Sequence, residues 1–453
     1  MVPLKLSEIA ALAGGGLSGP DGAASGLCID SRKVGPGDLF VAVKGPRFDG
    51  HDFIRQALAA GAAGAVASAG WAGSRAGGFA ADGIIAVTDT LEALHRFAEN
   101  YRSRFDVVMI AITGTNGKTT TKEMIAQAAG ASFGVLKNQG NLNNQYGLPL
   151  SLAGLGPEHQ VAVMELGMSG FGEIALLCRL AKPQIGVITN VAEGHTQFLG
   201  DIGGVARAKG ELLECLPPDG TAVLNADSDI LMGQAARTKA RVVTFGIERP
   251  ATVKAESLEQ RPGGVSFRID GMDFELNLAG RHNVYNALAA VAVCDRLGLT
   301  RRESSRRLSE MRPVPMRQEI LKLKNCILIN DAYNANPESM SAALDTLRET
   351  AGTGRKVAVL ADMLELGEIG PVRHREIGEL AGRSAELVVA IGPLAAYINE
   401  GAAAAGADSR HFEDNGRAIP YVLSAIRPGD TLLVKGSRGM KLEEIVEAVK
   451  EKD

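Results

Sequence analysis

The sequence VVMIAITGTNGKTTTKEMIAQAA, residues 107–129, decides the fold of this chain. Its first six residues are apolar and rich in branched side chains, which is typical of a strand buried on both faces. Residues 118–129 then place polar and apolar side chains at helical spacing, with Lys122 and Glu123 expected on the exposed face. A glycine-bracketed loop joins the two elements. Strand, loop and helix in this order predict a phosphate-binding loop.

The loop itself matches the chemistry of a polyphosphate site. Glycines let the backbone approach a phosphate chain, and amide N–H groups at a helix N-terminus supply partial positive charge. Lys118 is expected to reach the terminal phosphates, and the Thr119 hydroxyl to bind Mg²⁺. The common pattern requires glycine five places before Gly117, where this chain has Ile112, so the loop is a shorter variant. The expected nucleotide ligands are Gly114, Thr115, Asn116, Gly117, Lys118, Thr119 and Thr120.

Length and composition limit the class of protein. A chain of 453 residues is too long for one hydrophobic core, and we expect three domains. The net charge of −4 and the 4% aromatic content provide neither a basic surface nor stacking platforms for nucleic acid. Five widely spaced cysteines without a C-x-x-C pair are typical of thiols in the cytosol. No segment resembles a signal peptide or a membrane span, so we expect a cytoplasmic protein without membrane insertion.

Changes in pattern divide the chain into three α/β units, at residues 1–83, 84–312 and 313–453. The central unit holds the phosphate loop in a mostly parallel sheet, and the third begins after Pro313 and Pro315. Four predicted strands in the third unit alternate with helical stretches, at residues 326–330, 356–360, 387–391 and 431–434. This alternation predicts a doubly wound, Rossmann-like domain. No glycine fingerprint follows its first or last strand, which argues against NAD binding.

Polar residues follow two predicted strands of the central unit, at 161–164 and 185–189. Glu165 ends the first strand, and His195 follows the second. Ligands of parallel sheets gather beyond the carboxyl ends of the strands, so both side chains are expected to point toward the phosphate loop. A lone histidine is usually structural, but at this place it is a candidate Mg²⁺ neighbour. Lys209 lies on a helix predicted at 206–216, where a solvated surface lysine is the alternative.

Three other segments offer polar groups to ligands. Asn138, Asn141 and Asn143 precede a helix, and their amides suit polar ligand groups, although asparagine is also common in turns. His282 and Asn283 open a helix at 287–297, where a capping role for the asparagine is the alternative. In the C-terminal unit, Asn336 is expected to cap a helix whose first turn contains Pro337.

The N-terminal unit carries small hydroxyls and basic side chains on loops around a strand predicted at 39–43. Ser31, Arg32 and Lys44 are its candidate ligands. Charge-assisted hydrogen bonds from such residues suit the diphosphate of a sugar nucleotide. Surface turns would explain the same residues equally well.

Taken together, these motifs resemble those of the Mur ligases, ATP-dependent enzymes that build the peptide of bacterial peptidoglycan precursors. The resemblance covers nearly the whole chain. Residues 30–45, DSRKVGPGDLFVAVKG, look like a UDP-binding N-terminal domain, and residues 331–340, DAYNANPESM, are similar to the member that adds D-alanyl-D-alanine. The other matching positions are the TGTNGKTT loop, Glu165, His195, Lys209, the GRHNVYNALAA segment at 280–290, Arg317 and Asp331.

The resemblance implies an ADP-forming acid–amino-acid ligase that joins D-alanyl-D-alanine to UDP-N-acetylmuramoyl-tripeptide through an acyl phosphate. It implies ATP and Mg²⁺ as cofactors and Lys118 as a catalytic cation. The same resemblance places Thr119, Glu165, His195 and Lys209 at the metal, with Lys209 carbamylated by CO₂. We expect these two substrates as the partners of a monomeric enzyme.

The resemblance also assigns nucleotide and dipeptide contacts. His282 and Asn283 are implied at adenine, and Arg317 and Asp331 at ribose and phosphate. Asn334 and Asn336 are implied near the dipeptide.

Three alternatives remain open at this point. The diamino-acid-adding Mur ligase carries an Asp-Asn-Pro-Arg segment, and this chain has a related stretch at 414–417 with glycine in place of proline. A folylpolyglutamate-type ligase would share the ATPase core but lack the UDP-type N-terminal unit. A nucleotide switch without enzymatic activity would need only the phosphate loop.

Overall fold

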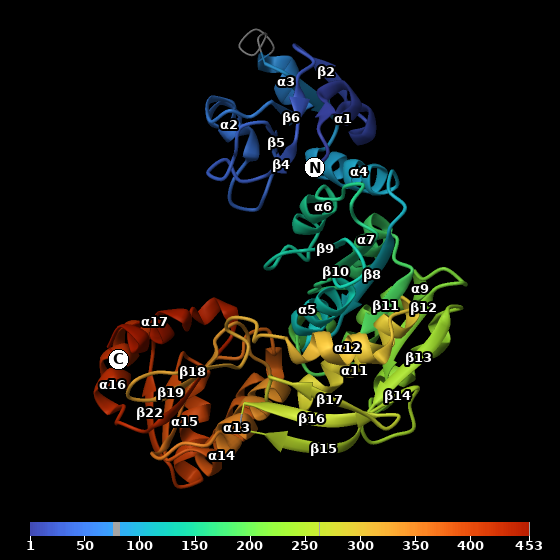
Figure 1. The fold of residues 1–453 in the computed structure, drawn as a ribbon. Helices are drawn as coiled ribbons and strands as arrows, with labels where there is room; N and C mark the ends of the chain where they lie inside the picture. Colours follow the sequence, from blue (N-terminus) through green and yellow to red (C-terminus); the bar gives the residue numbers. More distant parts are fainter. Residues whose placement is uncertain (76–81, 262, 453) are drawn as a thin grey trace.

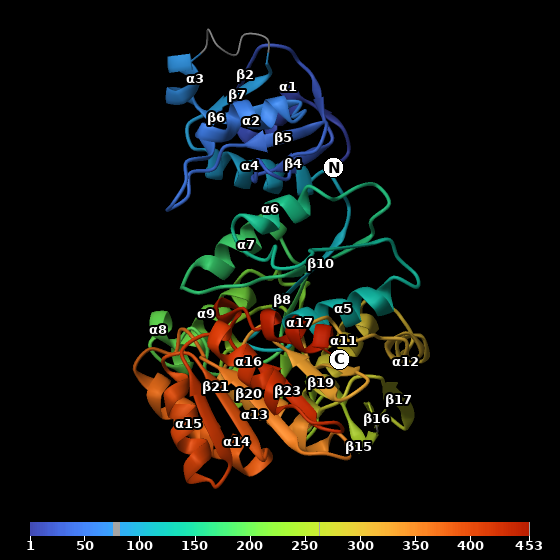
Figure 2. The same cartoon turned by 90° about the vertical axis from the view of Figure 1, so that its left-hand side faces the viewer.

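The computed structural model describes residues 1–75, 82–261 and 263–452, which fold into three units that follow one another along the chain. The N-terminal unit lies at one end of the molecule, and the C-terminal unit packs beside the central one (Figure 1). When the molecule is turned by 90°, the C-terminal sheet lies in front of the central unit, and the N-terminal unit lies apart from the C-terminal sheet (Figure 2). The termini therefore belong to units that lie at opposite ends.

The N-terminal unit is a five-stranded sheet in the order β2-β7-β6-β5-β4, in which only β2 runs antiparallel to its neighbour. Helices α1 (Leu6–Ala13) and α4 (Thr90–Arg102) share an apolar core on one face. The boundary predicted at residue 83 falls too early, because β7 pairs with both β2 and β6. The strands are β2 (Gly16–Ser18), β4 (Gly26–Cys28), β5 (Asp38–Val41), β6 (Gly64–Ser68) and β7 (Ile84–Val87).

The central unit is built on a seven-stranded, all-parallel sheet in the order β14-β13-β12-β11-β8-β10-β9. The predicted central strand is β8, and its side chains alternate between two cores. Ile110 and Ile112 pack under α5 and α11, whereas Met109 and Ala111 pack with α7 and α9. The strands are β8 (Val108–Thr113), β9 (Val135–Lys137), β10 (Val161–Glu165), β11 (Ile185–Ile188), β12 (Thr221–Asn225), β13 (Arg241–Gly246) and β14 (Val253–Lys254).

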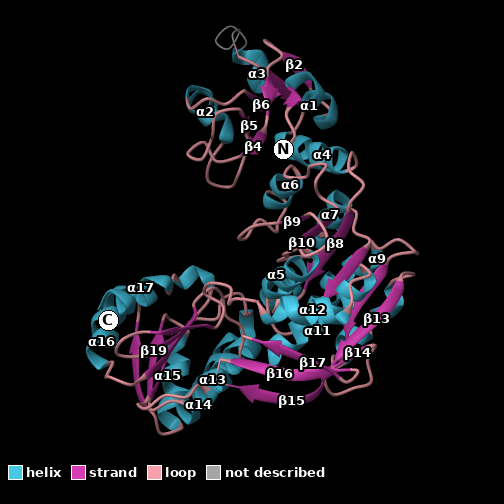
Figure 3. Cartoon of the chain, in the orientation of Figure 1, coloured by secondary structure: helices cyan, strands magenta, loops and turns pink. Residues whose placement is uncertain are grey.

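Helices cover both faces of this sheet (Figure 3). Helix α9 begins earlier than predicted, because the Asp201 side chain caps it through the Gly204 N–H group. A small antiparallel sheet, β15-β16-β17, packs against α11 and α12. These elements are α5 (Lys118–Ala129), α7 (Glu173–Ala181), α9 (Ile202–Glu214), α11 (Arg281–Arg296), α12 (Arg301–Ser309), β15 (Glu256–Arg261), β16 (Gly264–Ile269) and β17 (Met272–Leu276).

The C-terminal unit confirms the doubly wound prediction. Its six-stranded sheet has the order β18-β19-β23-β20-β21-β22, parallel except for β18. Helices α13, α14 and α15 pack on one face, and α16 and α17 on the other. The elements are β18 (Glu319–Lys322), β19 (Ile327–Asp331), β20 (Lys356–Ala361), β21 (Leu387–Ile391), β22 (Asp408–Phe412), β23 (Thr431–Lys435), α13 (Pro337–Glu349), α14 (Gly370–Ser384), α15 (Ala395–Ala404), α16 (Asn415–Ala425) and α17 (Glu443–Lys452).

Short helices and strands complete the fold, and the prediction that the Lys122 side chain is exposed is wrong. No helix in the described residues is long and apolar enough to cross a membrane. Lys122 was expected on the exposed face of α5, but its side chain is only 1% exposed. Its Nζ donates to the Asn138 carbonyl oxygen at 2.7 Å, which satisfies the buried ammonium. The short elements are β1 (Leu4–Lys5), β3 (Ala23–Ala24), α2 (Ile54–Ala59), α3 (Ala69–Arg75), α6 (Gly147–Leu152), α8 (Thr196–Leu199) and α10 (Asp229–Met232).

Candidate active site

Three adjacent strands, β11, β8 and β10, end at the same edge of the central sheet, and the phosphate loop follows the middle one. The loop needs glycine at two positions. Gly114 and Gly117 have φ angles of 149° and 79°. A Cβ at Gly114 would lie 1.8 Å from the Thr189 hydroxyl oxygen, and one at Gly117 would lie 2.2 Å from Asn286 Oδ1. The backbone can therefore approach its neighbours, and a ligand, only because both side chains are absent.

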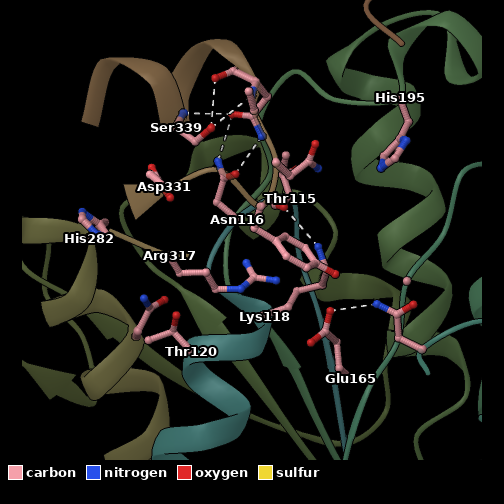
Figure 4. Close-up of a pocket in the computed structure, with 18 of the residues that line it drawn as sticks. Thr115, Asn116, Lys118, Thr120, Glu165, His195, His282, Arg317, Asp331 and Ser339 are labelled. Atoms are coloured by element: carbon pink, nitrogen blue, oxygen red, sulfur yellow. Dashed lines mark hydrogen bonds between the residues drawn. The ribbon is translucent and has the colours of Figure 1, made fainter. Parts of the chain in front are cut away.

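Lys118 folds back over the loop that precedes it (Figure 4). Its Nζ donates to the carbonyl oxygens of Gly114 and Thr115 at 2.8 and 3.1 Å. Burial lowers the pKa of Lys118, and Glu165 opposes this shift. The ammonium is thus held in place by two weak acceptors, which a phosphate group would replace with stronger, charge-assisted bonds.

Glu165, at the end of β10, is held from two sides. Its carboxylate accepts the Thr119 hydroxyl at 2.6 Å and the Asn143 amide at 2.9 Å. Burial acts to raise the pKa of Glu165, but the charges of Lys118 and Arg317 and the two hydrogen bonds together outweigh it, so the pKa lies below its usual value. The site therefore keeps an ionised carboxylate beside the phosphate loop.

Asn138 lies behind Glu165, and the main chain uses its side chain. Its Oδ1 accepts the Glu165 N–H at 2.9 Å, and its Nδ2 donates to the Glu165 carbonyl oxygen at 3.0 Å. Neither Asn138 nor Asn141 lines the cleft, whereas Asn143 does. The Asn138 side chain therefore holds the main chain at Glu165, a role that the asparagine-rich composition of its loop did not reveal.

The C-terminal unit forms the opposite wall of the cleft. Asp331 ends β19 and accepts the Lys435 ammonium at 2.7 Å and the Gln318 N–H at 3.2 Å. Burial raises the pKa of Asp331, although Lys435 opposes the shift. The Arg317 guanidinium lies 4.0 Å from the centre of the Tyr333 ring. Lys435 was missed, yet it ends a predicted strand and pairs in register with Asp331, so its place at a strand end was a usable signal.

Amide side chains join the two walls. Asn336 caps α13 as predicted, because its Oδ1 accepts the Ser339 N–H at 2.9 Å. Its Nδ2 donates to Asn116 Oδ1 of the phosphate loop at 2.7 Å. Glu338 accepts amide N–H groups from Asn116 at 2.6 Å and Asn190 at 2.7 Å. Burial raises the pKa of Glu338, and both amide bonds act against this shift. Sequence reasoning did not identify Glu338.

Lys209 and His282 are basic side chains in surroundings that disfavour a positive charge. Lys209 is 2% exposed, and burial together with the Lys118 ammonium lowers its pKa well below the ordinary value. Burial, helped by Lys435, lowers the pKa of His282 to about 4. Asn283 donates to the Ala279 carbonyl oxygen at 2.7 Å, so its amide is partly used by the start of the helix. His282 is accordingly expected to be neutral at pH 7, and burial favours the neutral form of the Lys209 amine.

Most of the predicted site residues line one cavity of about 330 Å³ between the central and C-terminal units. A second cavity of about 780 Å³ adjoins it and shares Asn116, Gly117 and His282. Together they provide room for an extended ligand that runs along the phosphate loop. The predicted residues that do not line the first cavity are Gly114, Thr119, Asn138, Asn141, Ser31, Arg32 and Lys44.

The N-terminal candidates form their own contacts. Arg32 pairs with Asp30 at 2.9 Å, and its side chain is 81% exposed. The Ser31 hydroxyl donates to the Gln56 side chain at 3.4 Å, and Lys44 pairs with Asp49 in an isolated β-bridge. These residues therefore present a separate polar surface and do not contribute to the cavity.

Comparison with known proteins finds family models along successive parts of the chain. Three family models match: "Mur ligase family, catalytic domain" at residues 23–102, "Mur ligase middle domain" at 112–294, and "Mur ligase, glutamate ligase domain" at 316–438. The UDP-N-acetylmuramoyl-tripeptide–D-alanyl-D-alanine ligase of Bacillus subtilis is 38% identical, with 98% of each chain covered.

Solved structures of similar proteins extend this finding. The crystal structure of MurF from Acinetobacter baumannii has a TM-score of 0.90 and 31% identity, with 99% of each chain covered. A MurF ligase from Thermotoga maritima in complex with ADP has a TM-score of 0.81 and 27% identity, covering 94% of this chain and 97% of its own. The similarity therefore extends across all three units.

Proposed function

Because the chain belongs to the Mur ligase family, we propose that it joins D-alanyl-D-alanine to UDP-N-acetylmuramoyl-tripeptide at the expense of ATP. The products are the UDP-linked pentapeptide, ADP and phosphate, in the synthesis of peptidoglycan precursors for the cell wall. The observation that carries the proposal is the contact between Asn116 of the phosphate loop and Asn336 of the DAYNANPESM segment. This contact brings the nucleotide side and the amine side of the reaction into one cleft.

The chemistry proceeds in two steps. A carboxylate oxygen of the tripeptide bonds to the γ-phosphorus of ATP, and ADP leaves. The amine of D-alanyl-D-alanine then bonds to the acyl carbon, and phosphate leaves while the amine loses a proton. Holding both partners in one cleft can supply about 7 to 11 kcal/mol of the barrier by removing translational and rotational freedom beforehand.

Positive charge is the main requirement of the first step. A carboxylate and a phosphate oxygen 4 Å apart repel each other by about 4 kcal/mol at an effective dielectric of 20. Lys118 and Arg317 both line the cleft and supply cations there. Lys118 needs only to exchange its two carbonyl partners for phosphate oxygens, so little reorganisation is required.

The residues present suit Mg²⁺ as a cofactor, with Thr119, Glu165 and His195 as its protein ligands. In the described part of the chain, no three His, Cys, Asp or Glu side chains come together to hold a metal unaided. This fits Mg²⁺, which usually binds one or two carboxylates together with substrate phosphates and water. The ion would supply Lewis-acid stabilisation of the transferred phosphoryl group.

Lys209 is proposed as the carbamate site that the family resemblance implies. Its neutral amine nitrogen would bond to the carbon of CO₂ and lose a proton, which turns the side chain into an anionic metal ligand. Only a neutral amine reacts in this way, and the buried position of Lys209 favours the neutral form. No carboxylate among the described residues is positioned to hold it as a cation.

Substrate positions follow from the three units. Ser31, Arg32 and Lys44 are proposed to bind the UDP group, and Asn334 and Asn336 to lie near the dipeptide. The nucleotide contacts are proposed for the phosphate loop, His282, Asn283, Arg317 and Asp331, and Asn143, which lines the cleft, is proposed to reach a ligand there. We retain Asn138 and Asn141 as weaker candidates, because the structure places them away from the cavity.

Location and assembly complete the proposal. The described structure contains no disulfide bond, which suits a reducing compartment, and we place the reaction in the cytoplasm. A monomer remains our prediction.

The diamino-acid-adding alternative is disfavoured, because Asp414 caps α16 and the Asn415 amide donates to the carbonyl oxygens of Met440 and Lys441. That segment is therefore used as a structural helix cap.

A coupled ADP-release assay tests the proposal. We expect ADP only when UDP-N-acetylmuramoyl-tripeptide and D-alanyl-D-alanine are supplied together, because the acyl phosphate stalls without an amine. Equal turnover with a diamino acid on the dipeptide precursor would instead support the diamino-acid-adding enzyme. Stimulation by glutamate would support a folylpolyglutamate-type ligase, and no stimulation by any amine would argue against a ligase.

A further inference from the structure

The short helix α8 of the central unit is bonded to the segment that follows β20 in the C-terminal unit. The Gln197 N–H donates to the Glu365 carbonyl oxygen at 3.1 Å, and the Thr196 hydroxyl donates to the Leu366 carbonyl oxygen at 3.1 Å. A Cβ at Gly367, whose φ is 61°, would lie 3.2 Å from Gln197 Cα. Glycine therefore permits an approach of the two backbones that another residue would resist.

Charged side chains strengthen the same contact. The Arg373 guanidinium donates two hydrogen bonds, of 2.6 and 2.7 Å, to the carboxylate of Glu193. This bidentate geometry is the strongest arrangement available to a guanidinium and a carboxylate. Beside it, Nδ1 of His195 lies 2.5 Å from Oε2 of Glu365. Among the described residues, Nδ1 of His195 makes no hydrogen bond of normal geometry, so this close approach of Glu365 is the contact that the ring nitrogen has.

Both residues of the His195–Glu365 pair have an unusual backbone. Their φ angles are 59° and 64°, in the left-handed region that residues with a Cβ seldom adopt. Such a conformation costs roughly 1 to 3 kcal/mol and persists where surrounding contacts impose it. Here the result is a ring that lines the cleft, as the labelled His195 in Figure 4 illustrates. The strained backbone at His195 and at Glu365 thus accompanies the orientation of the His195 ring toward the cleft.

We propose that Glu365 is a positioning residue that accepts the Nδ1 proton of His195 and leaves the Nε2 lone pair directed into the cleft. A histidine that binds a metal usually donates its other ring N–H to a carboxylate or carbonyl, and that partner fixes both tautomer and ring orientation. Here the partner comes from a different unit. Docking of the C-terminal unit therefore completes the metal-binding position of the central unit.

This inference rests on the proposed function only through the Mg²⁺–nucleotide site, and its first test reads the tautomer directly. The full-length chain, labelled with ¹⁵N-histidine, is compared with Glu365→Ala, and the His195 signals are identified by their loss in His195→Gln. The wild type should show a protonated Nδ1 and an unprotonated Nε2. The alanine variant should show a mixture of tautomers, because the acceptor that selects one of them is gone.

The second test measures binding of Mn²⁺ as a paramagnetic substitute for Mg²⁺, with ADP present and neither amine nor UDP-linked substrate added. Loss of a carboxylate behind a metal-binding histidine typically weakens metal affinity by about 10- to 100-fold, and we expect this of Glu365→Ala. Glu365→Gln keeps the shape and an acceptor oxygen, so it should fall between the two. Glu368→Gln removes an exposed carboxylate three residues away and should change the affinity by no more than about twofold.

The outcomes separate the possible explanations. Unchanged Mn²⁺ affinity in Glu365→Ala would refute the proposal, as would weakened affinity with an unchanged His195 tautomer, which would mean that Glu365 acts only by holding the units together. Glu365→Gln guards against misfolding, since its thermal unfolding midpoint should match that of the wild type. Failure of the ligase assay would leave both measurements interpretable, because neither uses the ligase substrates.

Discussion

The nucleotide cleft and the N-terminal polar surface differ in how their side chains find partners. In the cleft, partners come from distant parts of the chain: Asp331 pairs with Lys435, and Asn116 pairs with Asn336 across two units. On the N-terminal surface, Arg32 pairs with Asp30, only two residues away, and remains mostly exposed. The cleft is assembled before any ligand arrives, whereas the N-terminal surface is held mainly by local contacts.

This difference separates two kinds of contribution to activity. Preorganised groups need little rearrangement when charge develops in a transition state, so their loss should lower kcat. Exposed groups that first gain a partner from the substrate contribute mainly to binding, so their loss should raise KM. The following predictions test that separation, beginning with the largest expected effect.

Replacing Lys118 in the cleft should lower kcat more than any other substitution proposed below. Lys118→Ala removes the side-chain cation closest to the phosphate loop, and loss of one preorganised donor typically costs about 100- to 1000-fold in rate. We therefore expect kcat to fall by at least 100-fold in the ADP-release assay, as that range implies. Lys137→Ala, a half-exposed lysine on β9, is the matched control and should stay close to wild type. A variant that keeps a tenth of the wild-type rate would mean that the loop has been misread.

Lys209 tests whether the cleft needs an anion or a cation at this position. If Lys209 is a carbamate, Lys209→Arg should lose about 100-fold in kcat, an effect of the size seen for single electrostatic groups. Acetate or formate should restore part of the rate of Lys209→Ala, because a small acid can occupy the space of the carbamate. Robust activity of the arginine variant without rescue by acids would show that Lys209 acts as a cation.

His282 links the preassembled cleft to acid sensitivity. The unfolded histidine titrates near pH 6.5, whereas the folded one has a pKa of about 4, so the unfolded chain binds a proton first. Stability from this group is complete above pH 6.5 and is lost as the pH falls toward 4. His282→Gln should remove up to about 2 kcal/mol of the wild-type loss between pH 7 and pH 5. Urea midpoints of both proteins at the two pH values measure this, and equal acid sensitivity would contradict it.

Arg32 should give the smallest effect and the opposite kinetic signature. Arg32→Ala is expected to raise KM for the UDP-linked substrate about tenfold with little change in kcat, since a charge-assisted hydrogen bond contributes roughly 1.5 to 3 kcal/mol. Its ion pair with Asp30 is exposed and screened by solvent, so the loss of Arg32 should leave unfolding nearly unchanged. A fall in kcat at constant KM would remove the distinction between the two regions.

Local signals predicted elements that form the cleft. The phosphate loop, the positions of Glu165 and Asp331 at strand ends, and the Asn336 cap all depend on a few consecutive residues, so their patterns are legible in the sequence. The doubly wound C-terminal unit was predictable for the same reason, because its strands and helices alternate with clear apolar runs.

Contacts between distant segments were not predictable in this way. Lys122 looked like a surface residue by helical spacing, and only the fold brings the Asn138 carbonyl oxygen to it. Glu338 is buried against amides more than a hundred residues away, which no local pattern encodes. The boundary predicted at residue 83 separates strand β7 from the sheet of the N-terminal unit. It was placed at a change in sequence pattern, whereas the pairing of β7 with β2 and β6 determines where the sheet ends.

Burial of the thiols determines how this protein can be labelled chemically. Cys28, Cys178, Cys294 and Cys326 are buried, and only Cys215 is half-exposed. Burial raises the pKa of Cys294 to about 12, while a hydrogen bond from Cys178 lowers the pKa of Cys215. Because the thiolate is the nucleophile, maleimide dyes should attach first to Cys215. A Cys215→Ser chain is therefore the appropriate background for engineered cysteines that carry a donor and an acceptor dye on different units.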